Sequence, residues 1–191
     1  MSFLILPGFG GSGPAHWQSR WEARVEDASR FAPASWDRPD LEDWLAALER
    51  GLEQAEGPVV LVAHSLACLL TAHWAARQGE SVHVTAGRIA GALLVAPPDP
   101  EGPAFPREAS AGFRDVPRVA FGFPALVLAS SNDPYASPAF AQDFAQARGA
   151  GFLDIGPCGH INAESGLGDW EEGQRLLAAF AAGCGQPRAC M

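Results

Sequence analysis

The sequence is poor in positive charge. Its 191 residues include 13 arginines and no lysine against 22 aspartates and glutamates, which gives a formal net charge of −9. Proteins bind duplex nucleic acid largely by neutralising phosphates with basic side chains, and acidic membrane surfaces attract the same side chains. The charge balance therefore argues against nucleic acid and against a membrane surface as partners.

Long apolar runs are also missing. The run Phe3–Leu6 is ended by Pro7-Gly8, has no basic segment before it, and is too short for the apolar region of a signal peptide. No stretch approaches the length of a transmembrane helix. We therefore expect neither a targeting signal nor a membrane anchor, and we predict a cytoplasmic protein.

The cysteines show neither CxxC spacing nor a pairing pattern. There are four, Cys68, Cys158, Cys184 and Cys190. We expect them to be free thiols in a reducing compartment. We expect no metal, because Cys158 with its neighbours His160 and Glu164 matches no common zinc spacing. We also expect no cofactor.

The length and composition predict one globular domain. Hydrophobic residues make up 48% of the chain, enough for a substantial core. We place a single domain over 1–183 and a short C-terminal tail over 184–191. Oligomeric state is left open.

Apolar segments alternate with segments of helical spacing, which is typical of a parallel sheet covered by helices. Segments without internal alternation predict strands buried on both faces. We predict five such strands, with a weaker sixth near Arg30–Ala32. The five are Phe3–Leu6, Val59–Val62, Ile89–Val95, Ala125–Ala129 and Gly151–Ile155. The expected architecture is an α/β fold with a mostly parallel sheet of about six strands and helices on both faces.

Two helices are predicted in the first third of the chain. Pro14 is expected at the first position of one helix, whose apolar face recurs every four residues. That face is Trp17, Trp21 and Val25. Asp40 is expected to cap the second helix. Its apolar face is Leu41, Trp44, Leu45, Leu48 and Leu52.

Two more helices are predicted near the C-terminus. Ser137-Pro138 is expected to open one, with Phe140 and Phe144 facing inward. Asp169-x-x-Glu172 resembles a capping box and is expected to open the last helix. The inward residues of that helix are Leu176, Leu177 and Phe180. The Pro- and Gly-rich segment 97–124 predicts a long loop with at most one short helix, and such loops often border active sites.

A serine lies where an apolar strand meets a helical segment. In Val59–Ala67 the strand runs directly into Ser65, and apolar residues then follow at helical spacing. A nucleophile elbow requires this order, with small residues two positions before and after the serine. Glycine is usual at both positions, and here they are Ala63 and Ala67. The segment alone is therefore also compatible with a serine that only caps a helix.

An acid and a histidine follow Ser65 in the chain order that such hydrolases use. Asp133 and His160 each come after a predicted strand, and the carboxyl ends of parallel strands meet at one edge of a sheet. We therefore predict Ser65 as nucleophile, His160 as general base and Asp133 as the acid that orients the histidine. Asp99 is the alternative acid. Asp154 is a poorer one, because it lies within a predicted strand.

The glycine-rich segment after the first strand predicts an oxyanion hole. We expect the backbone N–H of Leu66 to supply one donor and that of Phe9 the other, with Gly10 behind it. The segment Gly8–Gly13 also suggests phosphate binding, but it matches neither Gly-Lys-Ser/Thr nor a clean GxGxxG pattern.

Three further residues are expected to take part in substrate binding because they lie near the predicted catalytic loops. They are Gly8, His64 and Trp17. His16, which also flanks a catalytic loop, is expected near the mouth of the site.

Several segments together resemble the small serine-hydrolase family that includes retinoblastoma-binding protein 9. They are Leu6–Ser12, His16-Trp17, His64–Ala67, Ser131–Tyr135 and Gly159–Gly166. The resemblance implies a compact α/β-hydrolase fold without a large cap domain, and catalytic roles for Ser65, Asp133 and His160. The namesake's partner-binding motif is Leu-x-Cys-x-Glu. Here Leu52–Glu56 has Gln54 in place of the cysteine, so the resemblance implies no protein partner for this chain.

These observations predict a serine hydrolase that cleaves a small ester, thioester or amide through an acyl-enzyme. A non-catalytic binding or scaffold protein and an acyltransferase on the same fold remain alternatives. The loop 97–124 offers few bulky apolar residues, chiefly Phe105 and Phe113. We therefore expect a shallow site and a preference for acyl groups of about two to six carbons.

Overall fold

The computed structural model describes residues 2–78 and 88–184. Six strands form one sheet in the order β2-β1-β3-β4-β5-β6, and every neighbouring pair is parallel. The strands are β1 (Ser2–Leu6), β2 (Ala28–Arg30), β3 (Val59–His64), β4 (Ile89–Val95), β5 (Ala125–Ala129) and β6 (Gly151–Asp154). The α/β class predicted from the sequence is confirmed.

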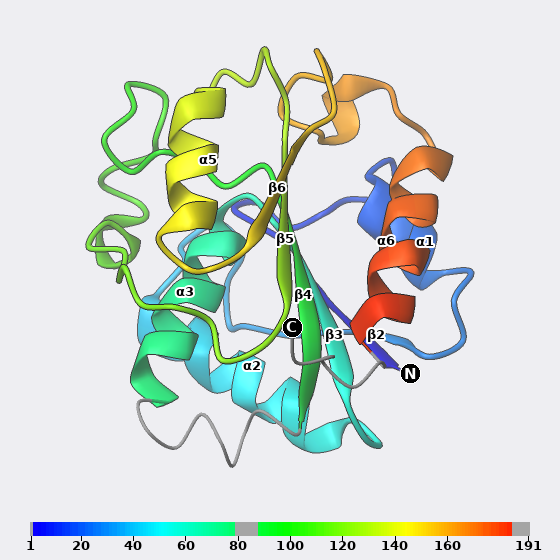
Figure 1. The fold of residues 1–191 in the computed structure, drawn as a ribbon. Coiled ribbons are helices and arrows are strands. Elements are labelled where there is room, and N and C mark those ends of the chain that lie inside the picture. Colours follow the sequence, from blue (N-terminus) through cyan, green and yellow to red (C-terminus); the bar gives the residue numbers. More distant parts are fainter. Residues whose placement is uncertain (1, 79–87, 185–191) are drawn as a thin grey trace, which may run out of the picture.

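Helices cover both faces of the sheet (Figure 1). On one face lie α1 (Trp17–Glu22) and α6 (Glu171–Cys184), and on the other lie α2 (Leu41–Gln54), α3 (Leu66–Gln78) and α5 (Pro138–Gln146). Two short 3₁₀ helices, η2 (Ala111–Phe113) and η3 (Ala163–Ser165), lie in connecting segments. No helix in the described part of the chain is long and apolar enough to span a membrane.

The central strands supply side chains to two separate cores. Leu4 and Leu61 pack on the side of α2 and α3, whereas their neighbours Ile5 and Val60 pack with the α1 and α6 side chains. This follows from the two-residue period of a strand. It also explains the runs without alternation, because both faces are buried.

The weaker sixth strand was misplaced by the sequence prediction. It covers Ala28–Arg30, which pairs with residues 3–5 of β1, and not Arg30–Ala32. Phe31 supplied the apolar signal, and it is fully buried, but it follows the paired residues. The short edge strand itself carries little apolar character.

The predicted starts of α2 and α5 are confirmed. The Asp40 side chain accepts a hydrogen bond from the Asp43 N–H, and Ser137 caps α5 in the same way through the Phe140 N–H. Along α2, the predicted apolar face is buried from Trp44 onward. At these two helices the side chain that precedes the helix caps it within the first turn, as the sequence predicts.

The predicted start of α1 is wrong. The helix begins at Trp17, three residues after Pro14, with His16 as its cap. The cap forms because His16 Nδ1 accepts a hydrogen bond from the Gln18 N–H at 3.2 Å. The helix ends at Glu22, so Val25 lies beyond it and is exposed.

The predicted capping box of α6 is also wrong. The helix begins at Glu171, and the residue before it, Trp170, has a φ of +43°. The Asp169 carboxylate instead forms ion pairs with Arg20 at 3.2 Å and Arg24 at 2.5 Å. Asp169 thus links the start of α6 to α1 rather than capping its own helix.

The segment between β4 and β5 is a long loop that contains only η2, as predicted. It packs Phe113 fully into the core. No large cap domain stands over the sheet in residues 2–78 and 88–184. Cys184 is the last residue of α6, and the rest of the predicted tail, 185–191, lies outside the described residues. The domain boundaries remain a prediction.

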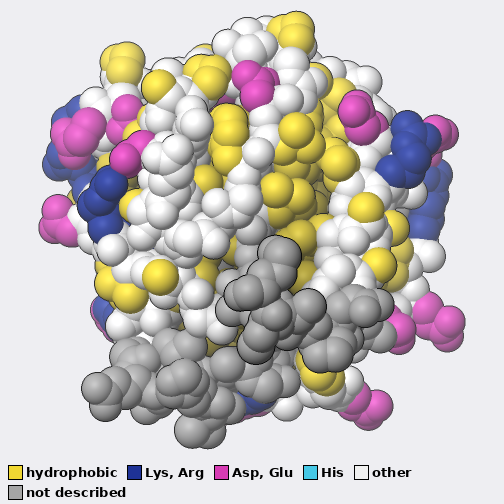
Figure 2. Space-filling model, in the orientation of Figure 1, with side chains coloured by type: hydrophobic (Ala, Val, Ile, Leu, Met, Phe, Trp, Pro, Cys, Tyr) yellow, Lys and Arg dark blue, Asp and Glu magenta, His cyan; other side chains and the backbone are white. Residues whose placement is uncertain are grey.

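The edge strand opposite β2 is β6, which has no fully buried residue. Leu153 on this strand is 38% exposed. On the face of the molecule drawn in Figure 2, apolar side chains gather along the middle and charged side chains lie toward the sides. The loop after β6 therefore starts from a strand that has little core packing.

Candidate active site

The chain order of the sheet creates a crevice at its carboxyl edge. From β1 the chain moves outward to β2, and it then returns to the other side of β1 to form β3. The loops after β1 and β3 consequently leave the sheet in opposite directions. In open α/β sheets, ligands bind at this kind of switch point.

Ser65 lies in the turn between β3 and α3. Its φ is +55°, a left-handed conformation that is unfavourable for a residue with a Cβ. The Ser65 N–H donates to the Val95 carbonyl at 2.9 Å, and Ala63 and Ala67 on either side are fully buried. The strained turn is thus held by strand pairing and by small residues that pack against the core.

Asp133, His160 and Ser65 form one chain of hydrogen bonds. His160 Nδ1 lies 2.9 Å from both carboxylate oxygens of Asp133, and His160 Nε2 lies 2.8 Å from Ser65 Oγ. Side-chain exposure is only 9% for His160 and 3% for Asp133, so water competes little for these bonds. The structure therefore brings the three predicted residues together in hydrogen-bonded order.

The two alternative acids are engaged elsewhere. Asp99 Oδ1 accepts a hydrogen bond from the Glu101 N–H, and Asp154 Oδ1 accepts one from the Gly156 N–H. Neither carboxylate hydrogen-bonds to His160.

The loops that carry Asp133 and His160 are tied to each other by side chains. Asn132 Oδ1 accepts hydrogen bonds from the Gly159 N–H at 2.7 Å and from Ser130 Oγ at 2.9 Å. Ser130 Oγ in turn accepts one from the Cys158 N–H at 2.9 Å. These contacts fix the separation of the two loops. Sequence reasoning did not single out Ser130 or Asn132, and only the turn-forming Asn-Asp-Pro segment hinted at their importance.

Two aromatic side chains hold the backbone around His160. His64 Nε2 donates to the His160 carbonyl at 2.9 Å, and Trp17 Nε1 donates to the Ile161 carbonyl at 2.7 Å. Trp17 is 1% exposed and does not line the cavity beside Ser65. The expectation that Trp17 binds substrate is therefore corrected: its indole lies behind the histidine loop and positions that loop.

Gly8 approaches the serine turn so closely that no side chain fits. A Cβ on Gly8 would lie 2.8 Å from Ser65 Cβ and 3.2 Å from Leu66 N. The N–H groups of Phe9 and Leu66 find no acceptor among the described residues. Leu66 N–H also lies at the start of α3, where the helix dipole favours negative charge. Both N–H groups are thus unused by the protein, and both residues line the same cavity as Ser65.

Gly10 does not provide a donor. Its N–H is used by the Trp36 carbonyl at 2.9 Å, and Gly10 does not line the cavity. Its φ of +75° is a left-handed backbone conformation that glycine adopts without strain. The expectation that Gly10 contributes to the oxyanion hole is therefore wrong.

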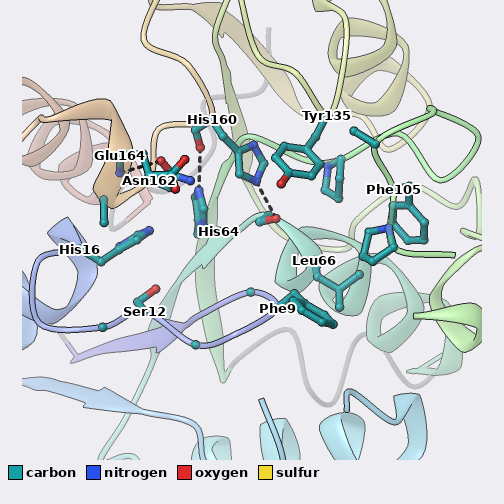
Figure 3. Close-up of a pocket in the computed structure, with 18 residues that line it drawn as sticks. Phe9, Ser12, His16, His64, Leu66, Phe105, Tyr135, His160, Asn162 and Glu164 are labelled. Atoms are coloured by element: carbon teal, nitrogen blue, oxygen red, sulfur yellow. Dashed lines mark hydrogen bonds between the residues drawn. The ribbon is translucent and has the colours of Figure 1, made fainter. Parts of the chain in front are cut away.

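A cavity of about 370 Å³ opens beside Ser65. Figure 3 shows its two unlike sides: Phe9, Leu66 and Phe105 lie on one, and His16, Asn162 and Glu164 on the other. Gly8 and His64 also line it. Phe113 belongs to the core instead, so Phe105 is the one bulky residue of the β4–β5 loop that reaches the cavity.

The histidines beside His160 are kept neutral. Burial, with smaller effects from Arg30 and His160, lowers the pKa of His16 to about 4. Burial also holds the pKa of His64 well below 6.5, reinforced by His160 and His16. The ring centroids of His64 and His160 are 5.0 Å apart. At neutral pH these neighbours therefore place no positive charge beside His160.

Metal-binding groups are not gathered here. Within the two described ranges, no cluster of three or more His, Cys, Asp or Glu side chains could hold a metal ion. The chemistry offered by the described residues is that of a hydroxyl, an imidazole, a carboxylate and backbone N–H groups.

Comparison with known proteins gives a family and a fold. The model of a family described as "Serine hydrolase" matches residues 3–179. A YdeN-like hydrolase from Pectobacterium atrosepticum is 35% identical, with a TM-score of 0.81 over 96% of this chain and 91% of that one. None of the curated proteins matches the sequence.

More distant structures share the fold alone. The ydeN gene product of Bacillus subtilis is 20% identical, with a TM-score of 0.74 over 95% of this chain and 98% of that one. A thermophilic esterase from Thermogutta terrifontis is 15% identical, with a TM-score of 0.66 over 97% and 91%.

Proposed function

Because the chain belongs to the serine hydrolase family, we propose that it cleaves a small carboxylic ester, thioester or amide through an acyl-enzyme. Ser65 is the nucleophile, His160 the general base and Asp133 the acid that orients it. The observation that carries this proposal is the unbroken chain of hydrogen bonds from Asp133 through His160 to Ser65, with links of 2.9 and 2.8 Å.

Acylation begins when Ser65 Oγ attacks the substrate carbonyl carbon and its proton passes to His160 Nε2. The carbonyl oxygen becomes an oxyanion, which accepts hydrogen bonds from the Phe9 and Leu66 N–H groups. The bond to the leaving group then breaks, and His160 returns the proton to the departing oxygen, sulfur or nitrogen. Asp133 stabilises the imidazolium in between.

Deacylation repeats these steps with water. Water attacks the acyl carbon while His160 Nε2 takes one of its protons, and the bond to Ser65 Oγ breaks as that proton returns to the serine. The products are a carboxylic acid and an alcohol, thiol or amine, and the enzyme is regenerated. An acyltransferase would use the same acyl-enzyme, so an added alcohol acceptor distinguishes the two activities.

A short acyl group suits the cavity. Its volume of about 370 Å³ lies near the lower end of typical ligand pockets, about 300–1,000 Å³. Each buried CH₂ contributes about 0.8 kcal/mol to binding, and methylenes beyond the cavity contribute nothing.

A series of p-nitrophenyl esters tests the proposal. We expect kcat/KM to be highest at about two to six acyl carbons and to fall beyond that. Activity should be insensitive to EDTA, and Ser65→Ala measures the background. A kcat/KM that climbs through ten or more carbons contradicts the short-acyl proposal, and equal rates for Ser65→Ala contradict the mechanism itself.

A further inference from the structure

His16 presents a buried hydrogen-bond donor that no protein group uses. The residue is 5% exposed and lines the cavity, and its Nε2 has no hydrogen-bond partner among the described residues. Its other nitrogen, Nδ1, accepts the Gln18 N–H that caps α1. A neutral imidazole with an accepting Nδ1 must carry its hydrogen on Nε2. With a pKa of about 4, the ring is neutral at pH 7.

A second donor lies on the same side of the cavity. Asn162 Oδ1 accepts the Glu164 N–H at 3.0 Å. The Asn162 amide NH₂ has no acceptor in the described part of the chain. Ser12 Oγ, also on this side, donates its hydrogen to Gln18 Oε1 at 2.6 Å. We call this side, formed by Ser12, His16, Asn162 and Glu164, the polar wall (Figure 3).

The opposite side is mostly apolar, with the Tyr135 hydroxyl as its polar group. Its apolar side chains come from the β1–α1 loop, the start of α3 and the β4–β5 loop. They are Phe9, Leu66, Pro98, Ala104, Phe105 and Pro106, which we call the apolar wall. Ser65 lines the same cavity as both walls, so a bound ester could place one half against each.

The donors on the polar wall select an acceptor oxygen. A buried donor without a partner is costly, whereas a matching acceptor makes its hydrogen bond favourable. The Glu164 carboxylate on the same wall repels an anion, which disfavours a substrate carboxylate. An uncharged oxygen therefore fits best.

The polar wall also lies on the histidine side of the site. The His16 and His64 rings are 4.8 Å apart, and those of His64 and His160 are 5.0 Å apart. The leaving group must depart beside His160, because that ring returns its proton.

We propose that His16 Nε2 on the polar wall recognises an uncharged acceptor oxygen, such as an ether, a hydroxyl or an amide carbonyl, in the leaving group of the substrate. The acyl chain lies against the apolar wall. This inference rests on the proposed hydrolase function and names the substrate class: short-chain acyl esters of oxygen-bearing alcohols.

Two nearly isosteric esters test the inference. In 2-methoxyethyl butyrate an ether oxygen replaces one CH₂ of n-butyl butyrate, and the acyl group is the same. The wild-type enzyme should prefer the methoxyethyl ester in kcat/KM by about fivefold to tenfold. In His16→Asn, the new Oδ1 can still cap α1, but no group replaces Nε2–H. The ratio of the two kcat/KM values should fall to about one.

The control is the same substitution at a histidine outside the cavity. His73 lies on α3, and its Nε2 is within 3.3 Å of the Phe113 carbonyl. His73→Asn should keep the wild-type ratio. An unchanged ratio in His16→Asn, or a wild-type ratio near one, overturns the inference.

A binding measurement separates this inference from the proposed function. In Ser65→Ala, the methoxyethyl ester should shift the NMR signals of the His16 imidazole, and the butyl ester should not. If the wild type hydrolyses neither ester but this shift occurs, the hydrolase proposal fails and the polar subsite stands. If hydrolysis occurs while both the shift and the change in ratio are missing, only the polar subsite fails.

Discussion

The proposed nucleophile and its acid–base partners are supported by unlike parts of the molecule. Ser65 follows β3, a central strand in which every residue is buried, and leads into α3, which is buried along most of its length. Asp133 and His160 follow β5 and β6, and β6 is an exposed edge strand. Packing therefore holds the nucleophile in place, whereas polar contacts hold the acid and the base.

This difference separates stability from activity. A change near Ser65 disturbs strand pairing and core packing, so it affects folding as well as reaction. A change in the loops after β5 and β6 removes one or two hydrogen bonds at the rim of the sheet. Such changes should lower kcat while the fold is retained, since they remove polar contacts and leave the buried Ile161 of the loop after β6 in place.

The largest effect is expected at the acid. Asp133→Asn replaces the carboxylate that accepts from His160 Nδ1, so the imidazole is no longer held in the tautomer that can accept the Ser65 proton. We expect kcat to fall by about 10⁴-fold with little change in Tm. Asp99→Asn, which changes a carboxylate that hydrogen-bonds to the Glu101 N–H and not to His160, is the matched control and should stay near wild type. A severe loss in Asp99→Asn with a mild one in Asp133→Asn would falsify the assignment.

Acid should lower the folding stability through the buried His16. His16 has a pKa of about 4 in the folded protein against 6.5 when free, so between these values the unfolded chain binds a proton that the folded chain does not. Stability is fully present above pH 6.5 and declines as the pH falls toward 4, by about 3 kcal/mol for this one group. Urea unfolding from pH 7 to 4.5 measures the decline.

His16→Asn removes this ionisable group and should flatten the pH dependence of unfolding. The His64 contribution, which has the same sign, remains in the variant. Identical pH dependence in the wild type and His16→Asn is the result that contradicts the burial argument.

A smaller effect is expected at the contacts between the loops. Asn132→Ala removes the acceptor for the Gly159 N–H and Ser130 Oγ. We expect kcat to fall about tenfold with KM nearly unchanged, because His160 is then less well placed for proton transfer. Ser131→Ala, an exposed residue in the same loop, should behave as wild type in both constants. A rise in KM without a fall in kcat would mean that Asn132 affects binding rather than the position of His160.

Much of the fold could be predicted because its signals are local. The buried strands contain uninterrupted apolar residues, and the Asp40 and Ser137 caps act within one turn. The same logic placed Ser65, Asp133 and His160 at one edge of the sheet, since each follows a strand. The predictions from local signals were wrong where a contact with a residue far along the chain determines the structure. Gly10 N–H is used by Trp36, and Asp169 is paired with α1 rather than with its own helix.

The supporting residues of the site could not be predicted for the same reason. Trp17 was expected to bind substrate, whereas its contact with the Ile161 carbonyl spans 144 positions of the chain. The free Nε2–H of His16 depends on which ring nitrogen caps α1, and on the absence of a neighbour for the other among the described residues. Such features arise only when the loops after β1 and β6 meet.

The central claim is that Ser65 is a nucleophile activated by His160. Incubation with a fluorophosphonate probe, followed by intact-protein mass spectrometry and peptide mapping, tests it directly. We predict one adduct per chain, located on Ser65, and no adduct on Ser65→Ala under the same conditions. Equal labelling of Ser65→Ala, or an adduct mapped to another residue of the wild type, would contradict the account.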